Sequence, residues 1–123
     1  TNSVSCTSAF SQKAAAAAIQ GPQDSVKMML KEFKERSKIV VDGFNAINGI
    51  SCIQPKGAFY AFPNIKDTGY KSQELSDALL NQGVAVLPGT SFGKYGEGYL
   101  RISFANSREN LNKALKIIKE FLD

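Results

Sequence analysis

The chain has 123 residues, of which 43% are hydrophobic and 21% charged, and its net charge is +4. This size and composition are ordinary for a single soluble domain with a core of its own. The absence of histidine excludes His-based catalytic triads and His-bearing metal sites. The lysines between residues 27 and 38 alternate with acidic residues, which indicates a solvated helical face and argues against a nucleic-acid partner.

No apolar run approaches the ~20 residues that span a bilayer, so we expect no membrane partner. The alanine run 14–18 lacks the basic region and the cleavage pattern of a signal peptide and is interpreted as helix. Two cysteines, Cys6 and Cys52, are too few for a disulfide framework. We expect both to be buried or half-buried thiols of a reducing compartment, and hence a cytoplasmic chain.

Two helices are predicted first. Residues 12–20 are rich in alanine, with Ser8 or Ser11 as the expected cap. Gly21-Pro22 ends this helix, and Pro22 suits the first position of the next one. From residue 22 to 47 the apolar residues recur every three or four positions, which predicts one long amphipathic helix. Asn48-Gly49 is expected to stop it.

Short strands and two further helices fill the rest of the chain. Residues 50–53 and 58–62 are predicted strands, with Gly57 serving the tight entry to the second. Ser72 is the expected cap of a short helix, and residues 84–87 and 99–104 are further strands. Asn106, with Glu109 three residues later, is expected to begin the last helix. The order ααββαββα predicts an α+β fold, a small sheet of short strands covered by helices and preceded by a long amphipathic helix.

One charged residue interrupts the last predicted strand. Alternation over residues 99–104 places Arg101 on one face, with Tyr99 and Ser103, and three apolar residues on the other. An arginine in mid-strand is costly to bury without an anionic partner, and its planar fork matches a carboxylate. The pattern alone leaves two interpretations open: a solvent-facing arginine on a half-exposed sheet, or a carboxylate-binding site.

Three motifs resemble one known family. Residues 82–105, from Gln82-Gly83 through VAVLPGTSFG to Arg101 and Ala105, resemble the C-terminal signature of the class I and II aminotransferases, the fold-type I enzymes that use pyridoxal phosphate. Upstream, residues 54–62, QPKGAFYAF, resemble the family's P-x-G-A-F-Y strand. Downstream, residues 106–111 resemble the start of its last helix. The order and spacing match over essentially the whole chain, and the likeness is greatest to the bacterial type of aspartate aminotransferase.

The resemblance implies site residues and a domain plan. Arg101 matches the family arginine that binds the α-carboxylate of substrates, and Phe59 matches a position beside the substrate. Residues 1–20 correspond to the tail end of the large cofactor domain or a dimer-contact segment, and residues 21–123 to the C-terminal small domain. A serine within residues 2–8 is expected to reach the partner subunit's active site in a homodimer.

The resemblance also shows what this chain lacks. The family's lysine that binds pyridoxal phosphate as a Schiff base, and the residues that hold the phosphate and the pyridine ring, precede the matched region. Lys94 lies in a tempting loop but has no family counterpart, and we expect an ordinary surface lysine. The chain therefore resembles the last third of an aminotransferase, with no catalytic residue, no cofactor and no metal of its own, and alone it is expected to be inactive.

Several activities fit the resemblance. The leading hypothesis is transfer of an amino group between aspartate and 2-oxoglutarate by the full-length parent. Aromatic, alanine or kynurenine aminotransferases and β-lyases share the arginine and remain open. A free-standing amino-acid-binding module fits poorly, since the two N-terminal helices have no place in it. A purely structural fragment, with exposed apolar faces that drive oligomerisation, is also compatible.

Overall fold

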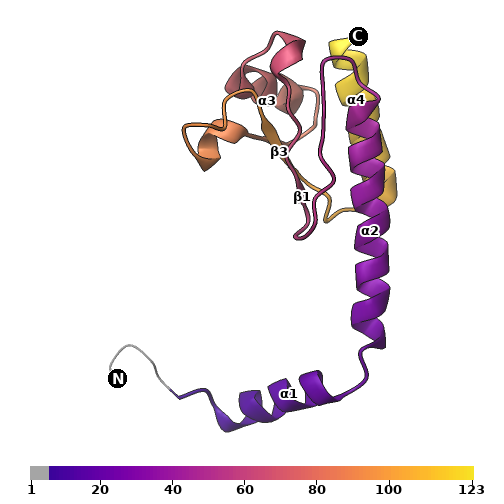
Figure 1. Cartoon of the computed structure of the whole chain (residues 1–123), viewed down its shortest axis with the longest axis vertical. Coiled ribbons are helices and arrows are strands. Elements are labelled where there is room, and N and C mark those ends of the chain that lie inside the picture. Colours follow the sequence, from indigo (N-terminus) through magenta and orange to yellow (C-terminus); the bar gives the residue numbers. More distant parts are fainter. Residues whose placement is uncertain (1–5) are drawn as a thin grey trace. The chain divides into compact units, whose positions relative to one another are not determined.

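The computed structural model describes residues 6–123 (Figure 1). The chain divides into two compact units, which meet between Lys31 and Glu32. The first contains helix α1 (Ala9–Gln20) and the first turns of helix α2 (Asp24–Asn45). No residue of α1 is buried, and the Gln23 amide closes its end by donating to the Ala18 carbonyl at 2.8 Å. The boundary expected between residues 20 and 21 stays a prediction.

Predictions about the N-terminal residues have mixed outcomes. Residues 2–5 lie outside the described residues, so the serine expected to reach a partner subunit stays a prediction. Cys6 is exposed, so the prediction of a buried or half-buried thiol is wrong there, because it precedes a helix that buries none of its residues. Cys52 is buried as expected, and burial raises the pKa of its thiol.

Three short antiparallel strands form the sheet of the second unit. Strand β3 (Leu100–Ser103) is central, with β1 (Tyr60–Ala61) on one side and β2 (Leu87–Pro88) on the other. Tyr60 is paired with Ser103, and Leu87 with Arg101. Single bridges from Ser51 to Asn64 and from Asn64 to Tyr99 continue the sheet beyond β1.

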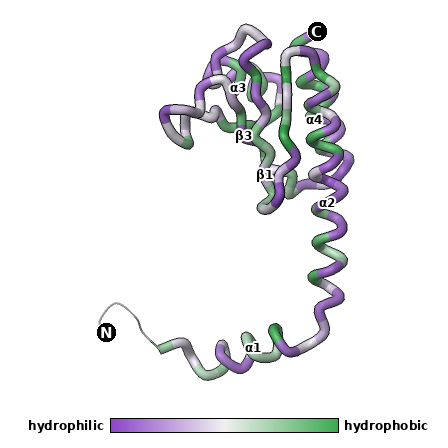
Figure 2. The backbone as a smooth tube through the Cα atoms, viewed as in Figure 1, coloured by the Kyte–Doolittle hydropathy of each residue, from purple (hydrophilic) through white to green (hydrophobic). Residues whose placement is uncertain are grey.

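Helices cover one face of this sheet. The later turns of α2, helix α3 (Ser72–Asn81) and helix α4 (Arg108–Leu122) bury their apolar residues against it, and Figure 1 shows α2 and α4 side by side. Hydrophobic and hydrophilic residues alternate along both of these helices (Figure 2), the pattern of a helix with one buried face. The core comprises Val40, Val41, Phe44, Ile47, Ile50, Cys52, Ala61, Ile65, Leu75, Leu79, Val84, Val86, Leu100, Ile102, Phe104, Leu111, Leu115 and Ile118. The predicted α+β fold is confirmed.

The strand expected at residues 50–53 is wrong in extent. Only Ser51 forms a bridge, because the backbone of Cys52 is hydrogen-bonded to the side chain of Asn45 instead of to a strand. The Cys52 amide donates to Asn45 Oδ1 at 2.7 Å, and Asn45 Nδ2 donates to the Cys52 carbonyl at 3.0 Å. The last residue of α2 thus occupies the place of a neighbouring strand.

The strand expected at residues 84–87 begins later, at Leu87. Helix α3 holds the preceding residues, since the Val84 amide donates to the Leu79 carbonyl at 2.9 Å. Ser76 Oγ donates to the Val86 carbonyl, also at 2.9 Å. These bonds tie residues 84–86 to the helix, so pairing with β3 starts only after them.

The turn before β1 differs from the expected one. Ala58, not Gly57, has the left-handed backbone, with φ of 59°. A non-glycine residue in this region carries a conformational cost that the surroundings must offset. Pairing resumes at Phe59, whose carbonyl accepts from the Phe104 amide at 2.9 Å. The paired strand is therefore shorter than the predicted 58–62.

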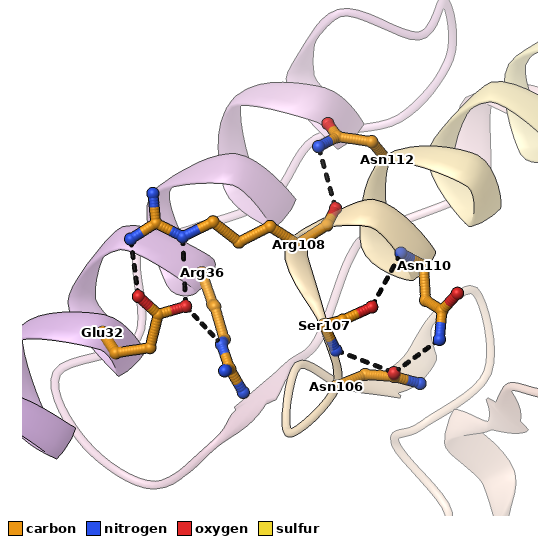
Figure 3. A network of polar contacts seen from close by, with 7 residues as sticks. All are labelled: Glu32, Arg36, Asn106, Ser107, Arg108, Asn110 and Asn112. Carbon is orange, nitrogen blue, oxygen red and sulfur yellow. Dashed lines mark hydrogen bonds and ion pairs between the residues drawn. The ribbon is translucent and has the colours of Figure 1, made fainter.

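Two of the three predicted N-caps are shifted, whereas α1 has the predicted Ser8 as its N-cap. Lys71, not Ser72, is the N-cap of α3, and the buried Ser72 side chain bonds to a distant loop instead. Ser107, not Asn106, is the N-cap of α4, where its hydroxyl accepts from the Asn110 amide at 3.1 Å (Figure 3). Both helices exist where the sequence predicts them, and only their first residues differ.

A shared carboxylate joins α2 to the start of α4. Glu32 accepts from Arg108 at 2.6 and 3.0 Å, and also from Arg36 at 2.8 Å (Figure 3). The two guanidinium groups lower the pKa of Glu32 to about 2. The network holds the start of α4 beside α2.

Candidate functional site

The site lies on the sheet face that the helices leave uncovered. Leu100, Ile102 and Phe104 are buried, with 0%, 6% and 1% of their surface exposed, whereas Arg101 is half-buried. The predicted alternation along β3 is thus confirmed. Arg101 projects from the middle of the sheet, away from the core.

Aromatic rings, and no acidic group, hold the Arg101 side chain. Its Cζ lies 4.4 Å from the ring centre of Tyr60 and 4.0 Å from that of Phe92. Tyr60 belongs to β1, and Phe92 ends the short 3-10 helix η2 (Gly89–Phe92) that follows β2. No carboxylate within residues 6–123 forms an ion pair with Arg101. The guanidinium therefore keeps its hydrogen-bonding edge available for an anion from elsewhere.

A small pocket opens beside the guanidinium. It has a volume of about 210 Å³. It is lined by Tyr60, Ala85, Val86, Leu87, Arg101 and Ser103. Drug-sized ligands occupy larger pockets, so this space suits one end of a small molecule, such as a carboxylate group.

Phe59 lies one aromatic ring away from Arg101. Its ring centre is 4.5 Å from that of Tyr60, and 6.3 Å from that of Phe33 on α2. Phe59 is 41% exposed and belongs both to the helix packing and to the edge of the site. The structure brings Phe59 and Arg101 into one neighbourhood through Tyr60, and a role of Phe59 beside the substrate stays a prediction.

Buried polar contacts fix the loop that carries Phe92. Ser72 Oγ accepts from the amides of Gly98 at 2.8 Å and Tyr99 at 3.2 Å. Glu97 Oε1 accepts from the Ser72 amide at 2.9 Å, so this carboxylate satisfies the first amide of α3. Those backbone contacts lower the pKa of Glu97.

The same loop is closed by two glycines. The backbones of Gly89 and Gly96 approach so closely that a Cβ on either would overlap the other's carbonyl oxygen. The Gly89 amide also donates to the Tyr99 carbonyl at 2.8 Å. The loop is thus held at both ends, and the close approach leaves no room for a side chain at Gly89 or Gly96.

Comparison with known proteins identifies the family. Residues 1–118 match the family described as "Aminotransferase class I and II". The chain belongs to this family. It is 49% identical over 100 residues to the aspartate aminotransferase of Pyrococcus horikoshii. The crystal structure of the Rhizobium meliloti aspartate aminotransferase superposes with a TM-score of 0.88 at 36% identity, over 99% of this chain. The aromatic aminotransferase structure from Pyrococcus horikoshii gives the same TM-score at 42% identity, over 95% of this chain.

The chain spans only part of these aminotransferases. It covers 26% of the Pyrococcus aspartate aminotransferase and 33% of the Rhizobium structure. The expectation that it resembles about a third of such an enzyme is confirmed. No helix in the described part is long and apolar enough to cross a membrane. Residues 6–123 also hold no group of acidic residues or cysteines placed to bind a metal ion.

The lysines of this aminotransferase chain do not fit a cofactor site. Pyridoxal phosphate requires a lysine held against the cofactor, but every lysine here is exposed. Lys94 lies over the ring of its neighbour Tyr95, at 4.9 Å, and Tyr95 is itself 84% exposed. The interpretation of Lys94 as a surface lysine is confirmed. No lysine within residues 6–123 is buried.

Sequence reasoning missed the aromatic partners of Arg101. Phe92 lies in a loop to which the sequence assigns no site residue, and Tyr60 is part of a family motif without a role of its own. Register gives a partial signal, since Tyr60 opposes Ser103 and therefore shares the face of Arg101. No local pattern places Phe92 there, because η2 follows β2 and is not paired with any strand of the sheet.

Proposed function

We propose that this chain is the small domain of a pyridoxal phosphate-dependent aminotransferase, in which Arg101 binds the α-carboxylate of the substrate. The observation that carries the proposal is a half-buried guanidinium beside a small pocket, with aromatic neighbours and no acidic partner in residues 6–123. A planar fork with free donors binds a carboxylate through two parallel hydrogen bonds. The site is built to receive an anion.

The arginine contributes orientation. A carboxylate held at two points fixes the rest of the substrate relative to the reacting groups, and such positioning accounts for a large part of many enzymatic rate enhancements. Pyridoxal phosphate, when bound, supplies the electron sink for amino-group transfer. Amino-acid and keto-acid substrates both carry the carboxylate, so one arginine serves both half-reactions of a ping-pong cycle.

The activity belongs to a protein of the relatives' length. We propose that a lysine outside this chain binds the cofactor, that the active protein is a cytoplasmic homodimer, and that the 123-residue chain alone is inactive. The supporting observation is the exposure of every lysine. Phe59, joined to the site through Tyr60, is proposed to border the substrate.

Aspartate and 2-oxoglutarate are the proposed substrates. Several similar proteins are named aspartate aminotransferases, among them those of Pyrococcus horikoshii, Pyrococcus abyssi and Rhizobium meliloti. The alternative is an aromatic or alanine substrate, because similar solved structures also carry those names. Arg101 does not separate these options, since all of these substrates share the α-carboxylate.

Steady-state kinetics of the full-length enzyme test the proposal. Arg101→Lys keeps the charge but loses the fork, and Arg101→Ala loses both. We expect kcat/KM to fall for every amino-acid substrate tested. The fall should be larger in Arg101→Ala than in Arg101→Lys. A loss confined to dicarboxylic substrates would show that Arg101 reads the side chain instead. Comparison of aspartate with phenylalanine and alanine in the unaltered enzyme decides the substrate class.

A further inference from the structure

We propose that Tyr60 and Phe92 are positioning residues that fix the plane of the Arg101 guanidinium and leave its donor edge free. The inference rests on the proposed function of Arg101 and adds to it the means by which the fork is preorganised. It concerns two side chains that carry no charge and need not touch the substrate.

The two rings reach the guanidinium from both flanks of the central strand. Tyr60 comes from β1 on one side of β3, and Phe92 comes from η2, which follows β2 on the other side. Both ring centres lie within 4.4 Å of Arg101 Cζ. Cation–π attraction extends to about 6 Å, so both contacts are well inside its range.

Aromatic faces can hold the guanidinium without occupying its hydrogen-bond donors, which a carboxylate cannot do. A ring attracts the cation through its quadrupole but accepts none of the five N–H groups in the guanidinium plane. The side chain is thereby immobilised while its hydrogen-bonding capacity is retained. An acidic neighbour would immobilise the side chain equally well, but it would occupy the edge that a substrate carboxylate needs.

The other two arginines of the chain provide the contrast. Arg36 and Arg108 both donate to Glu32, at 2.8 and 2.6 Å. Both guanidinium groups therefore donate to a carboxylate: Arg108 joins α4 to α2, whereas Arg36 bonds within α2 (Figure 3). Arg101 alone of the three has rings in place of an acid within residues 6–123.

Phe92 is itself held in place. Its loop is closed by the bond from the Gly89 amide to the Tyr99 carbonyl and by the buried Ser72 hydroxyl. The Phe62 ring packs edge-on against Phe92, with centres 6.2 Å apart. A ring on a fixed loop can limit the rotamers of a long side chain, whose freedom otherwise costs binding free energy.

NMR relaxation on the 123-residue chain tests the positioning directly. The chain has three arginines, so the Nε–H signal of Arg101 is assigned by its loss in Arg101→Lys. We expect an order parameter above 0.6 in the unaltered chain and below 0.6 in Phe92→Leu, the range of flexible groups. Phe92→Tyr keeps a ring and should keep the order. Tyr95→Leu is the matched control, since that exposed aromatic residue of the same loop packs on Lys94.

Kinetics of the full-length enzyme test the consequence. Phe92→Leu should raise KM roughly three- to tenfold for every amino acid, with kcat within twofold. The reason is that a fixed Arg101 binds the carboxylate equally in the ground state and in the transition state. Phe92→Tyr should restore KM, and Tyr95→Leu should leave both constants unchanged. Tyr60→Leu should resemble Phe92→Leu. A merely structural defect would lower the active fraction, and with it kcat, at constant KM.

Distinct results would overturn the two proposals. An Arg101 Nε–H that is flexible in the unaltered chain, or equally ordered in Phe92→Leu, refutes the positioning role whatever Arg101 binds. An unchanged KM in Phe92→Leu does the same. If instead Arg101→Lys and Arg101→Ala leave kcat/KM intact, the proposed function fails even though the aromatic contacts remain.

Discussion

Replacing Ser72 with alanine should destabilise the chain through one buried hydroxyl. Ser72 is 0% exposed, and its Oγ accepts from the Gly98 and Tyr99 amides and donates to the Gly96 carbonyl at 3.4 Å. A buried amide left without an acceptor costs about 1–3 kcal/mol, and a typical hydrogen bond contributes about 1 kcal/mol net. The magnitude depends on what the two amides do once the hydroxyl is gone.

Each amide retains a second acceptor. Gly98 N also donates to Glu97 Oε1 at 3.2 Å, and Tyr99 N to the Gly96 carbonyl at 3.2 Å. Neither is orphaned, so the full desolvation penalty does not apply. We therefore expect Ser72→Ala to lower the free energy of unfolding by about 2 kcal/mol, the net value of the two lost amide bonds. The bond to the Gly96 carbonyl, at 3.4 Å, is long and contributes little.

Urea denaturation followed by circular dichroism measures this change. For a slope of about 2 kcal/mol/M, a loss of about 2 kcal/mol lowers the midpoint by about 1 M without changing the slope. Ser91→Ala, an exposed serine in the same loop, should stay within about 0.5 kcal/mol. A midpoint for Ser72→Ala equal to that of Ser91→Ala would refute the reasoning. A loss above about 4 kcal/mol would show that the amides cannot use their second acceptors.

Three further predictions concern acid stability, loop closure and the cofactor. Arg108 and Arg36 lower the pKa of Glu32 from 4.5 to about 2, so its contribution to stability is complete above pH 4.5 and is lost as the pH falls toward 2. Urea midpoints at pH 5, 4 and 3 should therefore fall more steeply in the unaltered chain than in Glu32→Gln, and parallel curves would contradict this. Gly96→Ala should cost about 3 kcal/mol or more by calorimetry, because its Cβ meets backbone, whereas Gly57→Ala, whose Cβ meets open space, should change little. The 123-residue chain, mixed with pyridoxal phosphate and desalted, should retain no cofactor absorbance, because all its lysines are exposed. Stoichiometric retention would contradict the proposal that the cofactor-binding lysine lies outside this chain.

The sequence predicts those parts of the fold that follow from a local period. Arg101 was placed on the open face because strand alternation separates it from Leu100 and Ile102, and the structure agrees. The long helix was located within two residues at each end, since its apolar residues repeat at helical spacing. Periodicity indicates which side of a helix or strand is buried. It is therefore sufficient to predict both the face on which Arg101 lies and the extent of the long helix.

What the sequence could not predict depends on side chains distant in the chain. Asn45 binds the backbone of Cys52, and Ser76 that of Val86, so two predicted strands lost part of their pairing to helix side chains. The α3 amide that a local cap was expected to satisfy is bonded by Glu97, 25 residues beyond Ser72. Such contacts leave no trace in local spacing, because any polar residue in the right place would make them.

The same holds for the candidate site. The alternation along a single strand is enough to single out Arg101, and the family resemblance predicts its role in binding a carboxylate. The approach of Phe92 depends on how a loop closes over β3, which involves Ser72 on a different helix. A single strand pattern contains no information about that closure.

The left-handed Ala58 bears on the order in which this chain folds. A residue that adopts such a backbone only under outside constraint cannot start a turn by itself. The neighbouring bond from the Phe104 amide to the Phe59 carbonyl supplies the constraint, and it joins segments 45 positions apart. The approach to β1 should therefore become ordered late, after the central strand is in place, and exchange its amide protons early when the native state opens.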